Sequence, residues 1–391
     1  MVWGDETNRF GFFLIVKAKI KMKKITVRLA VINIFTVLFF ADAKAGNPDR
    51  AGQAGANELL VNSWARSSGW NGANTSGIRG LESMQLNVAG LAFTPKTEMI
   101  FARTNWLAPS GININSFGFA QTMGDAGTIG LQINSWNFGD IERTTVQNPE
   151  GGIGTFSPQF INLGFGYAKR FSSTISGGLV ARVINEAIED VRASGVAVDA
   201  GVQYVTSSKP GSKSIKKDDI KFGVSVRNIG PDMSYRGDGM AQKARILGND
   251  YDNTLQNRSA SFNLPSMLMI GASYDFRLDK DTNTYFHRLT MAGTFISHSF
   301  QQNQVMYGLE YGYKNFLMFR AGYAFENGIF DELGPGGRQS ALTGFAGGFS
   351  IDVPLSKQNK NTFGFDYSYR STNPFNGIHT FGLRINLADL D

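Results

Sequence analysis

The chain has 391 residues, no cysteine and a formal net charge of +6 at pH 7. This length fits one large β-barrel or two ordinary globular domains, and the lack of cysteine excludes disulfide frameworks and thiolate metal sites. Residues 1–45 hold eight Lys and Arg against three acidic residues, which leaves 30 basic against 29 acidic residues in the remainder. The remainder is therefore nearly neutral, and its charge gives no reason to expect a nucleic-acid partner.

Residues 1–45 have the pattern of a leader with a cleaved signal peptide. Met22-Lys23-Lys24 opens a basic region, residues 29–40 form a mostly apolar stretch of 12, and Ala43-Lys44-Ala45 offers small residues for cleavage before Gly46. An apolar run of 12 is too short for the roughly 20 residues that a spanning helix needs. We therefore expect cleavage between Ala45 and Gly46, and Met22 as the natural start.

Residues 46–96 precede the first segment with strong alternation and are predicted to form an N-terminal plug or an external cap. Their apolar residues have a short helical spacing, and a Gly-rich stretch, 67–80, follows. The apolar residues are Ala54, Ala56, Leu59, Leu60, Val61 and Trp64.

Residues 97–391 contain repeated segments in which every second side chain is apolar or aromatic, as in Ile161, Leu163, Phe165 and Tyr167. This alternation is typical of a transmembrane strand with one face in lipid. We expect fourteen strands, at 97–106, 112–123, 126–138, 158–169, 173–185, 194–207, 218–229, 263–276, 286–298, 303–314, 315–325, 341–354, 362–371 and 377–388. The predicted fold is an all-β membrane protein, a 14-stranded antiparallel outer-membrane β-barrel with an N-terminal plug or cap segment.

The connections predict which end of the barrel faces outward. A first strand that starts in the periplasm places 139–157, 186–193, 230–262 and 326–340 outside, and short turns at Asp125, Phe171-Ser172 and Lys314-Asn315 inside. The inner connection 208–217 carries Lys209, Lys213, Lys216 and Lys217 and is predicted to be a solvated turn. Loop 230–262 is longer than a connector needs and is the candidate partner-binding loop, through Tyr235, Arg236, Met240, Arg245 and Tyr251.

Charged residues of both signs occur in the polar phase of the strands and are predicted to face the lumen. An Arg facing lipid near the bilayer midplane costs about 2–4 kcal/mol, which favours this assignment. We favour charges that pair and fill the interior over an open polar conduit, because an unpaired desolvated charge is unfavourable. The residues are Arg182, Asp199, Arg227, Glu310, Arg320, Asp366 and Arg384.

Catalytic and metal-binding patterns are missing. The three histidines, His287, His298 and His379, show no His-x-x-x-His spacing, and the sequence contains no Gly-x-Ser-x-Gly motif. We therefore expect no enzymatic activity, no cofactor and no metal.

Two motifs resemble known families. The stretch Asn87-Val88-Ala89-Gly90-Leu91-Ala92 resembles the Asn-Pro-Ala-Gly-Leu-Ala motif of FadL-type outer-membrane barrels, with Val88 at the proline position. Residues 224–235, which include Asn228, Ile229, Gly230 and Pro231, resemble the Asn-Ile-Gly-Pro stretch of the PorV/PorQ branch of that superfamily. The strand pair at 182–184 and 195–204 also resembles that branch.

The resemblance to the PorV/PorQ family implies a multi-pass protein of the outer membrane that works in the type IX secretion system of Bacteroidetes. Its implied partners are outer-membrane lipid, the secretion translocon and secreted proteins with a C-terminal sorting domain, which it would bind and hand on. Two alternatives stay open: a FadL-like transporter of hydrophobic small molecules, and a purely structural barrel.

Overall fold

The computed structural model describes residues 47–207, 218–245, 247–248, 250–279, 286–334, 337–355 and 361–388. The predicted leader and the predicted lysine-rich turn at 208–217 lie outside the described residues. Among those described, no helix has both the length and the hydropathy that crossing a membrane requires.

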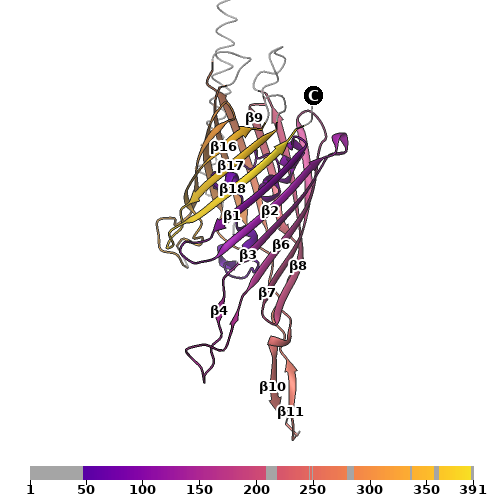
Figure 1. Cartoon of the computed structure of the whole chain (residues 1–391), viewed down its shortest axis with the longest axis vertical. Coiled ribbons are helices and arrows are strands. Elements are labelled where there is room, and N and C mark those ends of the chain that lie inside the picture. Colours follow the sequence, from indigo (N-terminus) through magenta and orange to yellow (C-terminus); the bar gives the residue numbers. More distant parts are fainter. Residues whose placement is uncertain are drawn as a thin grey trace, which may run out of the picture. The chain divides into compact units, whose positions relative to one another are not determined.

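Fourteen antiparallel strands form one closed barrel (Figure 1). The barrel closes where β1 pairs with β18, from Thr97 opposite Leu387 to Asn105 opposite His379. The strands are β1 (Thr97–Asn105), β2 (Asn113–Thr122), β3 (Thr128–Asn137), β6 (Gln159–Arg170), β7 (Ile175–Ile188), β8 (Val191–Thr206), β9 (Ile220–Ile229), β12 (Met267–Arg277), β13 (His287–His298), β14 (Gln304–Tyr313), β15 (Leu317–Glu326), β16 (Gly344–Pro354), β17 (Thr362–Arg370) and β18 (Ile378–Leu387).

The predicted fourteen-strand barrel is confirmed, and two of its boundaries need correction. Residues 186–193 are not a free loop, because β7 and β8 pair continuously until Ile188 lies opposite Val191 and only residues 189–190 turn. The strand predicted at 263–276 begins at Met267 instead, since Asn228 donates its side-chain N–H to the carbonyl of Pro265 and holds that residue outside the ladder.

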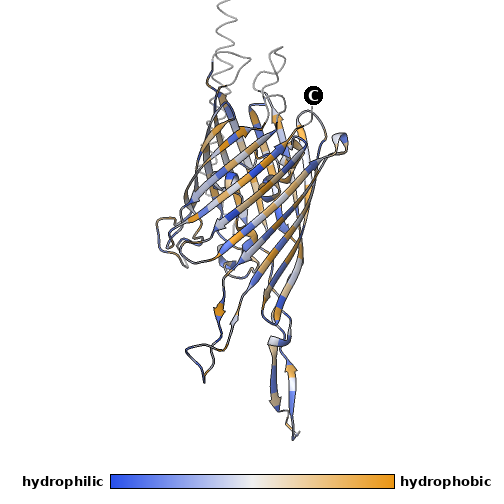
Figure 2. Ribbon diagram, viewed as in Figure 1, coloured by the Kyte–Doolittle hydropathy of each residue, from blue (hydrophilic) through white to orange (hydrophobic). Residues whose placement is uncertain are grey.

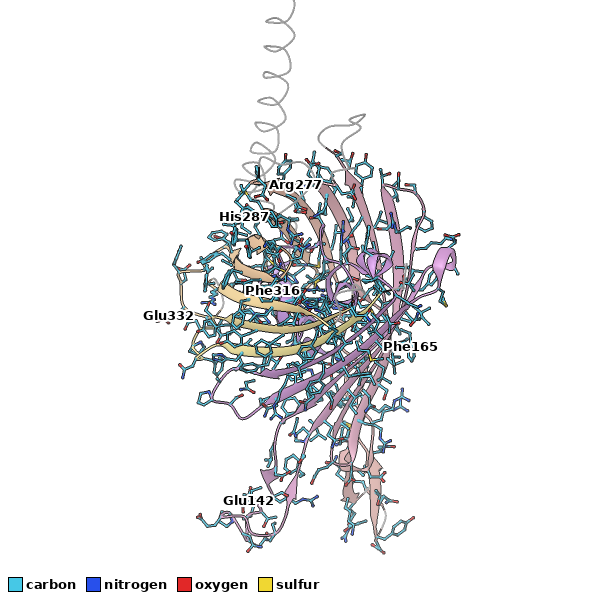
Figure 3. The ribbon with its side chains drawn as sticks, turned by 45° about the horizontal axis from the view of Figure 1, so that its top comes forward. Glu142, Phe165, Arg277, His287, Phe316 and Glu332 are labelled. Atoms are coloured by element: carbon cyan, nitrogen blue, oxygen red, sulfur yellow. The ribbon has the colours of Figure 1, made fainter. Side chains whose placement is uncertain are left out.

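Side chains alternate between the interior and the outer surface. In β1, for example, every second residue from Glu98 to Thr104 is buried while its neighbours are exposed or half-buried. The outward residues are largely aromatic and aliphatic, such as Phe101, Phe165 and Phe319. Figure 2 shows apolar residues along the barrel strands, and Figure 3 labels Phe165. Phe165 is 54% exposed in the isolated chain, so the barrel presents an apolar surface that requires lipid to cover it.

The two ends of the barrel differ in the length of their connections. Short turns at 123–127, 171–174 and 314–316 lie at the end where β1 begins and β18 ends. The opposite end carries the longer connections, and within these β4 (Ile141–Glu142) pairs with β5 (Thr155–Phe156), and β10 (Ala241–Arg245) pairs with β11 (Asp252–Gln256). Figure 1 shows both hairpins extending beyond the barrel strands. We assign the end with short turns to the periplasm, as is usual for such barrels.

Residues 47–96, called the plug segment below, lie among the inward side chains of the strands. They contain the short helices η1 (Pro48–Arg50), η2 (Asn57–Leu60), α2 (Ala65–Ser68), α3 (Ser83–Leu86) and η3 (Val88–Phe93). Trp64, Leu81 and Leu91 are fully buried and pack in one cluster with strand residues such as Ile100 and Val180. The apolar core of the molecule is thus shared between the plug segment and the barrel wall.

Candidate functional site: the filled interior and the outer hairpins

The plug segment contacts every one of the fourteen barrel strands. Ten strands exchange hydrogen bonds with it: Glu98 with Leu81 N, Ser116 and Asn134 with Ser63, Arg182 with Met84 O, Gln203 with Ile78 O, Ser225 with Leu86 O, Ser273 with Ser76, Thr294 with Ala73 O, Asn71 with Gly344 O, and Arg370 with Asn62 O. The other four approach it closely through Gly166, Gly308, Gly322 and Gly382.

The close approach at β15 shows why glycine is needed there. A Cβ atom on Gly322 would lie 2.4 Å from the carbonyl oxygen of Trp70 and 2.5 Å from its carbonyl carbon. Both are backbone atoms, which cannot move aside as the end of a side chain can. The Trp70 ring in turn lies against Gly308 of the neighbouring strand β14, so these two glycines form the seat for one large aromatic residue.

Three of the seven predicted lumen charges meet on strands β7, β8 and β9. The Nε atom of Arg182 donates to Asp199 at 2.6 Å, and the Nε atom of Arg227 lies 3.9 Å from the same carboxylate oxygen. Each of the three residues is at most 3% exposed. The arginines also donate to plug carbonyls, Arg182 to Met84 and Arg227 to Leu59. This triad therefore ties the wall to the plug segment.

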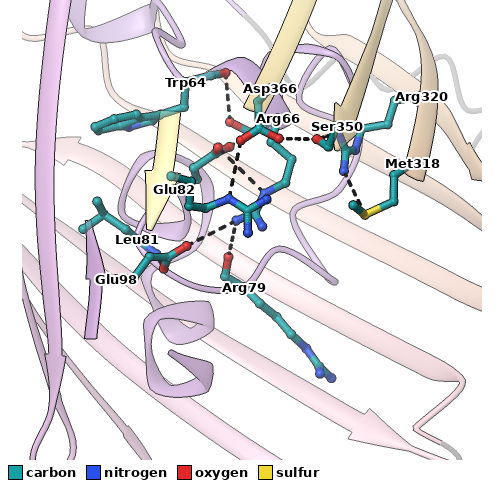
Figure 4. A network of polar contacts seen from close by, with 12 residues as sticks. Trp64, Arg66, Arg79, Leu81, Glu82, Glu98, Met318, Arg320, Ser350 and Asp366 are labelled. Carbon is teal, nitrogen blue, oxygen red and sulfur yellow. Dashed lines mark hydrogen bonds and ion pairs between the residues drawn. The ribbon is translucent and has the colours of Figure 1, made fainter. Parts of the chain in front are cut away.

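The other four predicted lumen charges lie in a chain of contacts across six neighbouring strands, from β13 to β18. Arg288 and Arg320 both donate to Glu310, each at 2.6 Å. Arg320 also donates to Ser350, which donates to Asp366, and Arg384 bonds to both Asp366 and Asp352. Figure 4 shows part of this network beside the plug residues Arg66 and Glu82. Opposite charges thus fill this side of the lumen.

The motif residues of the plug segment hold its last turn in place. The side chain of Asn87 accepts a hydrogen bond from Ala89 N and caps η3, and it donates to the carbonyls of Val202 and Val224 in the wall. Ala89 and Leu91 are fully buried. A Cβ atom on Gly90 would lie 2.2 Å from the carbonyl oxygen of Ile78. Packing against the rest of the plug segment therefore explains why a glycine stands at this position of the motif.

The second motif forms an irregularity in the barrel wall. The register between β8 and β9 shifts between Val198 and Ala200, where Asn228 has a positive φ of 58°. The N–H of Asn228 donates to the carboxylate of Asp199 at 2.7 Å. Ile229 points to the outer surface, and Gly230 packs against Val196 O, with Pro231 following the strand. The motif therefore ends β9 and starts the long outer loop.

The five candidate partner-binding residues do not share one surface. Tyr235 packs against Phe262 and donates to Glu186, and the backbone of Arg236 pairs with Arg192. Met240 ends η5 (Asp238–Met240). Arg245 forms an exposed ion pair with Asp252, whereas Tyr251 projects freely into solvent. Only Tyr251 combines a large apolar side chain with high exposure.

Sequence reasoning missed the most exposed apolar residues of the outer end. Leu247 at the tip of the β10–β11 hairpin, Val146 in the loop between β4 and β5, and Phe330 after β15 are each at least 90% exposed. The available signal was one apolar residue, or two in a row as at 246–247 and 329–330, within an otherwise polar connection. Such residues stand above the membrane surface, where lipid does not cover them, and are typical of protein contact sites.

Two carboxyl groups meet where the plug segment touches the outer loop. Burial raises the pKa of Glu58 to about 8, and the neighbouring Glu186 acts in the same direction. Burial and the hydrogen bond to Glu186 raise the pKa of Tyr235. Glu58 is therefore largely protonated at neutral pH, which lets it lie beside a second carboxyl group.

Among the cavities that the described residues line, two lie toward opposite ends of the interior. The first, of about 250 Å³, lies toward the outer end and is lined mainly by apolar groups with Arg227, His298 and Arg370. The second, of about 400 Å³, lies toward the periplasmic end and is lined mainly by charged groups. The two share no lining residue within the described part of the chain, because the plug segment separates them.

The three histidines take part in packing. His287 hydrogen-bonds to Tyr311 and His379 to Tyr367 through their Nδ1 atoms, while His298 is buried beside Gln304. The described ranges contain no group of three or more His, Asp or Glu side chains arranged to hold a metal ion.

The closed barrel, its apolar outer surface and its two unlike ends define the class: this is a multi-pass β-barrel of the outer membrane.

No family model matches the chain, and no curated protein matches it. Among solved structures, the chain is similar to the toluene transporter TbuX of Ralstonia pickettii, with 11% identity over 84% of this chain and 99% of that one and a TM-score of 0.48. For the toluene transporter TodX of Pseudomonas putida the identity is 12% over 83% of this chain and 97% of that one, with a TM-score of 0.49. For a FadL homologue of Pseudomonas aeruginosa the identity is 11% over 82% of this chain and 96% of that one, with a TM-score of 0.45.

Proposed function

We propose that this protein is a non-conducting, non-enzymatic barrel that binds secreted client proteins, or the translocon, of the type IX secretion system and hands the clients on. The observation that carries the proposal is the plug segment, which contacts all fourteen strands and fills the lumen.

The filled interior argues against a continuous conduit through the barrel. The seven inward charges predicted from the sequence are paired with one another, and the cavities of about 250 and 400 Å³ on opposite sides of the plug segment share no lining residue among those described. An open pore would require the plug to leave, and its departure would strip partners from buried groups such as Arg182 and Arg370. Losing partners for buried charged groups is strongly unfavourable. A barrel built in this way is better suited to docking than to conduction.

The outer end supplies surfaces for docking. The β10–β11 hairpin presents Leu247 and Tyr251, and two further connections present Val146 and Phe330. Aromatic and aliphatic side chains of this kind act as anchors in protein interfaces. We assign the partner as the shared C-terminal domain of secreted proteins, because the segment from Asn228 to Pro231, which resembles the PorV/PorQ branch, leads directly into this hairpin.

The test is mass spectrometry of the proteins that co-purify with a tagged full-length chain extracted gently from native outer membrane. The docking variant Leu247→Ser/Tyr251→Ala removes two exposed apolar groups from the hairpin. The control Met123→Ser/Phe171→Ser removes two exposed apolar groups from periplasmic turns.

Recovery of a translocon or of secreted proteins with a common C-terminal domain, lost in the docking variant and kept in the control, is the expected result. Recovery of lipid or hydrophobic ligand alone would overturn the proposal.

A transporter of hydrophobic small molecules is the second candidate, and the outer cavity favours it. Met267, Met269, Ile296 and Met306 line this cavity of about 250 Å³ together with Leu60 of the plug segment. Unbranched, polarizable methionine side chains adapt to apolar ligands of different shapes. Uptake of an aromatic hydrocarbon into proteoliposomes, abolished by Met306→Trp, would support transport. Uptake equal to that of protein-free vesicles would exclude it.

A further inference from the structure

The periplasmic cavity has an excess of positive charge. Seven cationic side chains line it against four acidic ones, which gives a net charge of +3. The cations come from the plug segment and from strands β9, β12, β13 and β15 and the β14–β15 turn, so they surround the space from several directions. The cationic residues are Arg66, Arg79, Lys221, Arg277, Arg288, Lys314 and Arg320; the acidic ones are Glu82, Asp218, Asp275 and Glu310.

Three of the four acidic groups are already engaged by basic neighbours. Lys221 donates to Asp275 at 2.6 Å, Arg288 and Arg320 share Glu310, and Arg66 lies 3.7 Å from Glu82. Such pairs neutralise each other and leave little attraction for a further ion. The charge that could act on a ligand must therefore come from the remaining cations.

Three cations remain, and Arg277 has an interaction of its own, so Arg79 and Lys314 supply the charge that is available to a ligand. Both are exposed, and their cationic ends lie over aromatic rings, Arg79 over Phe93 at 4.5 Å and Lys314 over Phe286 at 4.6 Å. Figure 4 shows the side chain of Arg79 pointing away from the cluster of Arg66, Glu82 and Glu98. A ring face orients a cation and leaves its N–H donors available to an anion.

A buried donor in the cavity wall also lacks an acceptor. Arg288 uses one terminal nitrogen for Glu310, whereas its Nε atom is buried without a hydrogen-bond partner among the described residues. Burying such a donor is unfavourable unless an acceptor reaches it. An anion placed beside Arg288 would supply the acceptor that its Nε atom lacks.

The number and direction of the donors select the chemistry of the anion. A guanidinium offers several N–H donors in a planar fork that matches phosphate and carboxylate oxygens. Donors that converge from the plug segment, β13 and the β14–β15 turn suit a multivalent anion with oxygens on all sides, as in phosphate. A cavity of about 400 Å³ has room for more than a single phosphate group.

We propose that the periplasmic cavity binds a phosphate-bearing ligand through Arg79, Lys314 and the Nε atom of Arg288. The phosphate belongs either to a soluble phosphate ester of the periplasm or to the headgroup of an inner-leaflet lipid. The site is independent of the docking role of the outer hairpins, since it lies at the opposite end of the barrel.

The experiment compares three versions of the full chain in phosphatidylcholine nanodiscs. The site variant Arg79→Gln/Lys314→Gln removes the two cations that lie over aromatic rings. Neither side chain forms an ion pair with another described residue. The control Arg192→Gln/Arg258→Gln removes two exposed charges from the outer end. Mobility on unheated gels verifies that each variant is folded. The Tm of each version is measured at increasing pyrophosphate concentration and constant ionic strength. In a second arm, phosphatidylglycerol is added to the nanodiscs and the Tm is measured again.

We expect pyrophosphate to raise the Tm of the wild type and the control, and the site variant to bind on the order of tenfold more weakly or worse. A Tm increase with phosphatidylglycerol alone, again lost in the site variant, would also support the site and identify the lipid source. Equal responses of the site variant and the wild type to both probes, or no response of the wild type to either, would overturn the proposal.

Discussion

The triad of Arg182, Asp199 and Arg227 allows a quantitative test of how the charges in the lumen stabilise the barrel. The substitution Asp199→Asn keeps the shape of the side chain and an oxygen that can still accept from Asn228 N. It removes only the negative charge. Two buried arginines are then left without the carboxylate that they share.

The magnitude follows from the distances. At an effective dielectric constant of about 20, opposite unit charges attract by roughly 6 kcal/mol at the Arg182 distance of 2.6 Å and by roughly 4 kcal/mol at the Arg227 distance of 3.9 Å. Desolvation of the three groups offsets much of this attraction, and removing one partner of a buried ion pair costs about 3–5 kcal/mol in practice. We therefore expect Asp199→Asn to lower the free energy of unfolding by about 3–5 kcal/mol.

Urea unfolding in phospholipid vesicles, followed by tryptophan fluorescence and gel mobility, measures this change. Asp252→Asn is the matched control, because Asp252 pairs with Arg245 at 3.4 Å with side chains 55% and 66% exposed. Exposed pairs contribute under about 1 kcal/mol. If Asp199→Asn destabilised the barrel no more than this control does, the inference that the triad ties wall to plug would be refuted.

Three further predictions concern the plug segment. Gly322→Val should displace Trp70 and raise the conductance of the barrel in planar bilayers. The control Gly312→Ala, where the atoms nearest to the new Cβ would lie 3.6 Å away, should leave the conductance unchanged. Equal conductance of the two variants would refute the inference that Gly322 seats Trp70. The pKa of Glu58 is about 8 in the folded state and has its ordinary, lower value in the unfolded state. The free energy of unfolding should therefore fall as the pH rises from the lower pKa to the higher one, by up to about 1.4 kcal/mol per pH unit. Glu58→Gln should flatten that dependence in unfolding measured at a series of pH values, and an unchanged slope would contradict the assignment. Trp70→Ala should lower the free energy of unfolding in urea by about 3–5 kcal/mol by leaving a cavity; a loss below about 1 kcal/mol would show that the plug is loosely packed.

The barrel strands were predictable because their signal is local. Alternation with a period of two is written in each segment separately, and β17, predicted at 362–371, runs from Thr362 to Arg370. The hairpins β4–β5 and β10–β11 were interpreted as loops, because β4 and β5 have only two residues each and the mostly polar β10 and β11 show no alternation. The extension of β7 and β8 toward residues 189–190 depends on cross-strand pairing, which a single segment does not reveal.

The candidate site was less predictable, since its partners are distant in sequence. Asp199 and Asn228 looked like unrelated features of two segments, yet the side chain of one accepts from the backbone of the other at the wall irregularity. Arg79 and Arg288 gave no signal, because only the seating of the plug segment brings them to one cavity. The exposure of residues such as Leu247 depends on how far the hairpin extends beyond the barrel. The alternation of polar and apolar residues does not predict that length.

The contacts of the plug segment have a consequence for the order of assembly. The segment is synthesised before every strand, yet its partners extend to Arg370 of β17 and to Gly382 of β18. It cannot complete its contacts until the last hairpin has arrived, so some of its groups lack their wall partners while the wall grows. The final seating of the segment is therefore a late step of biogenesis.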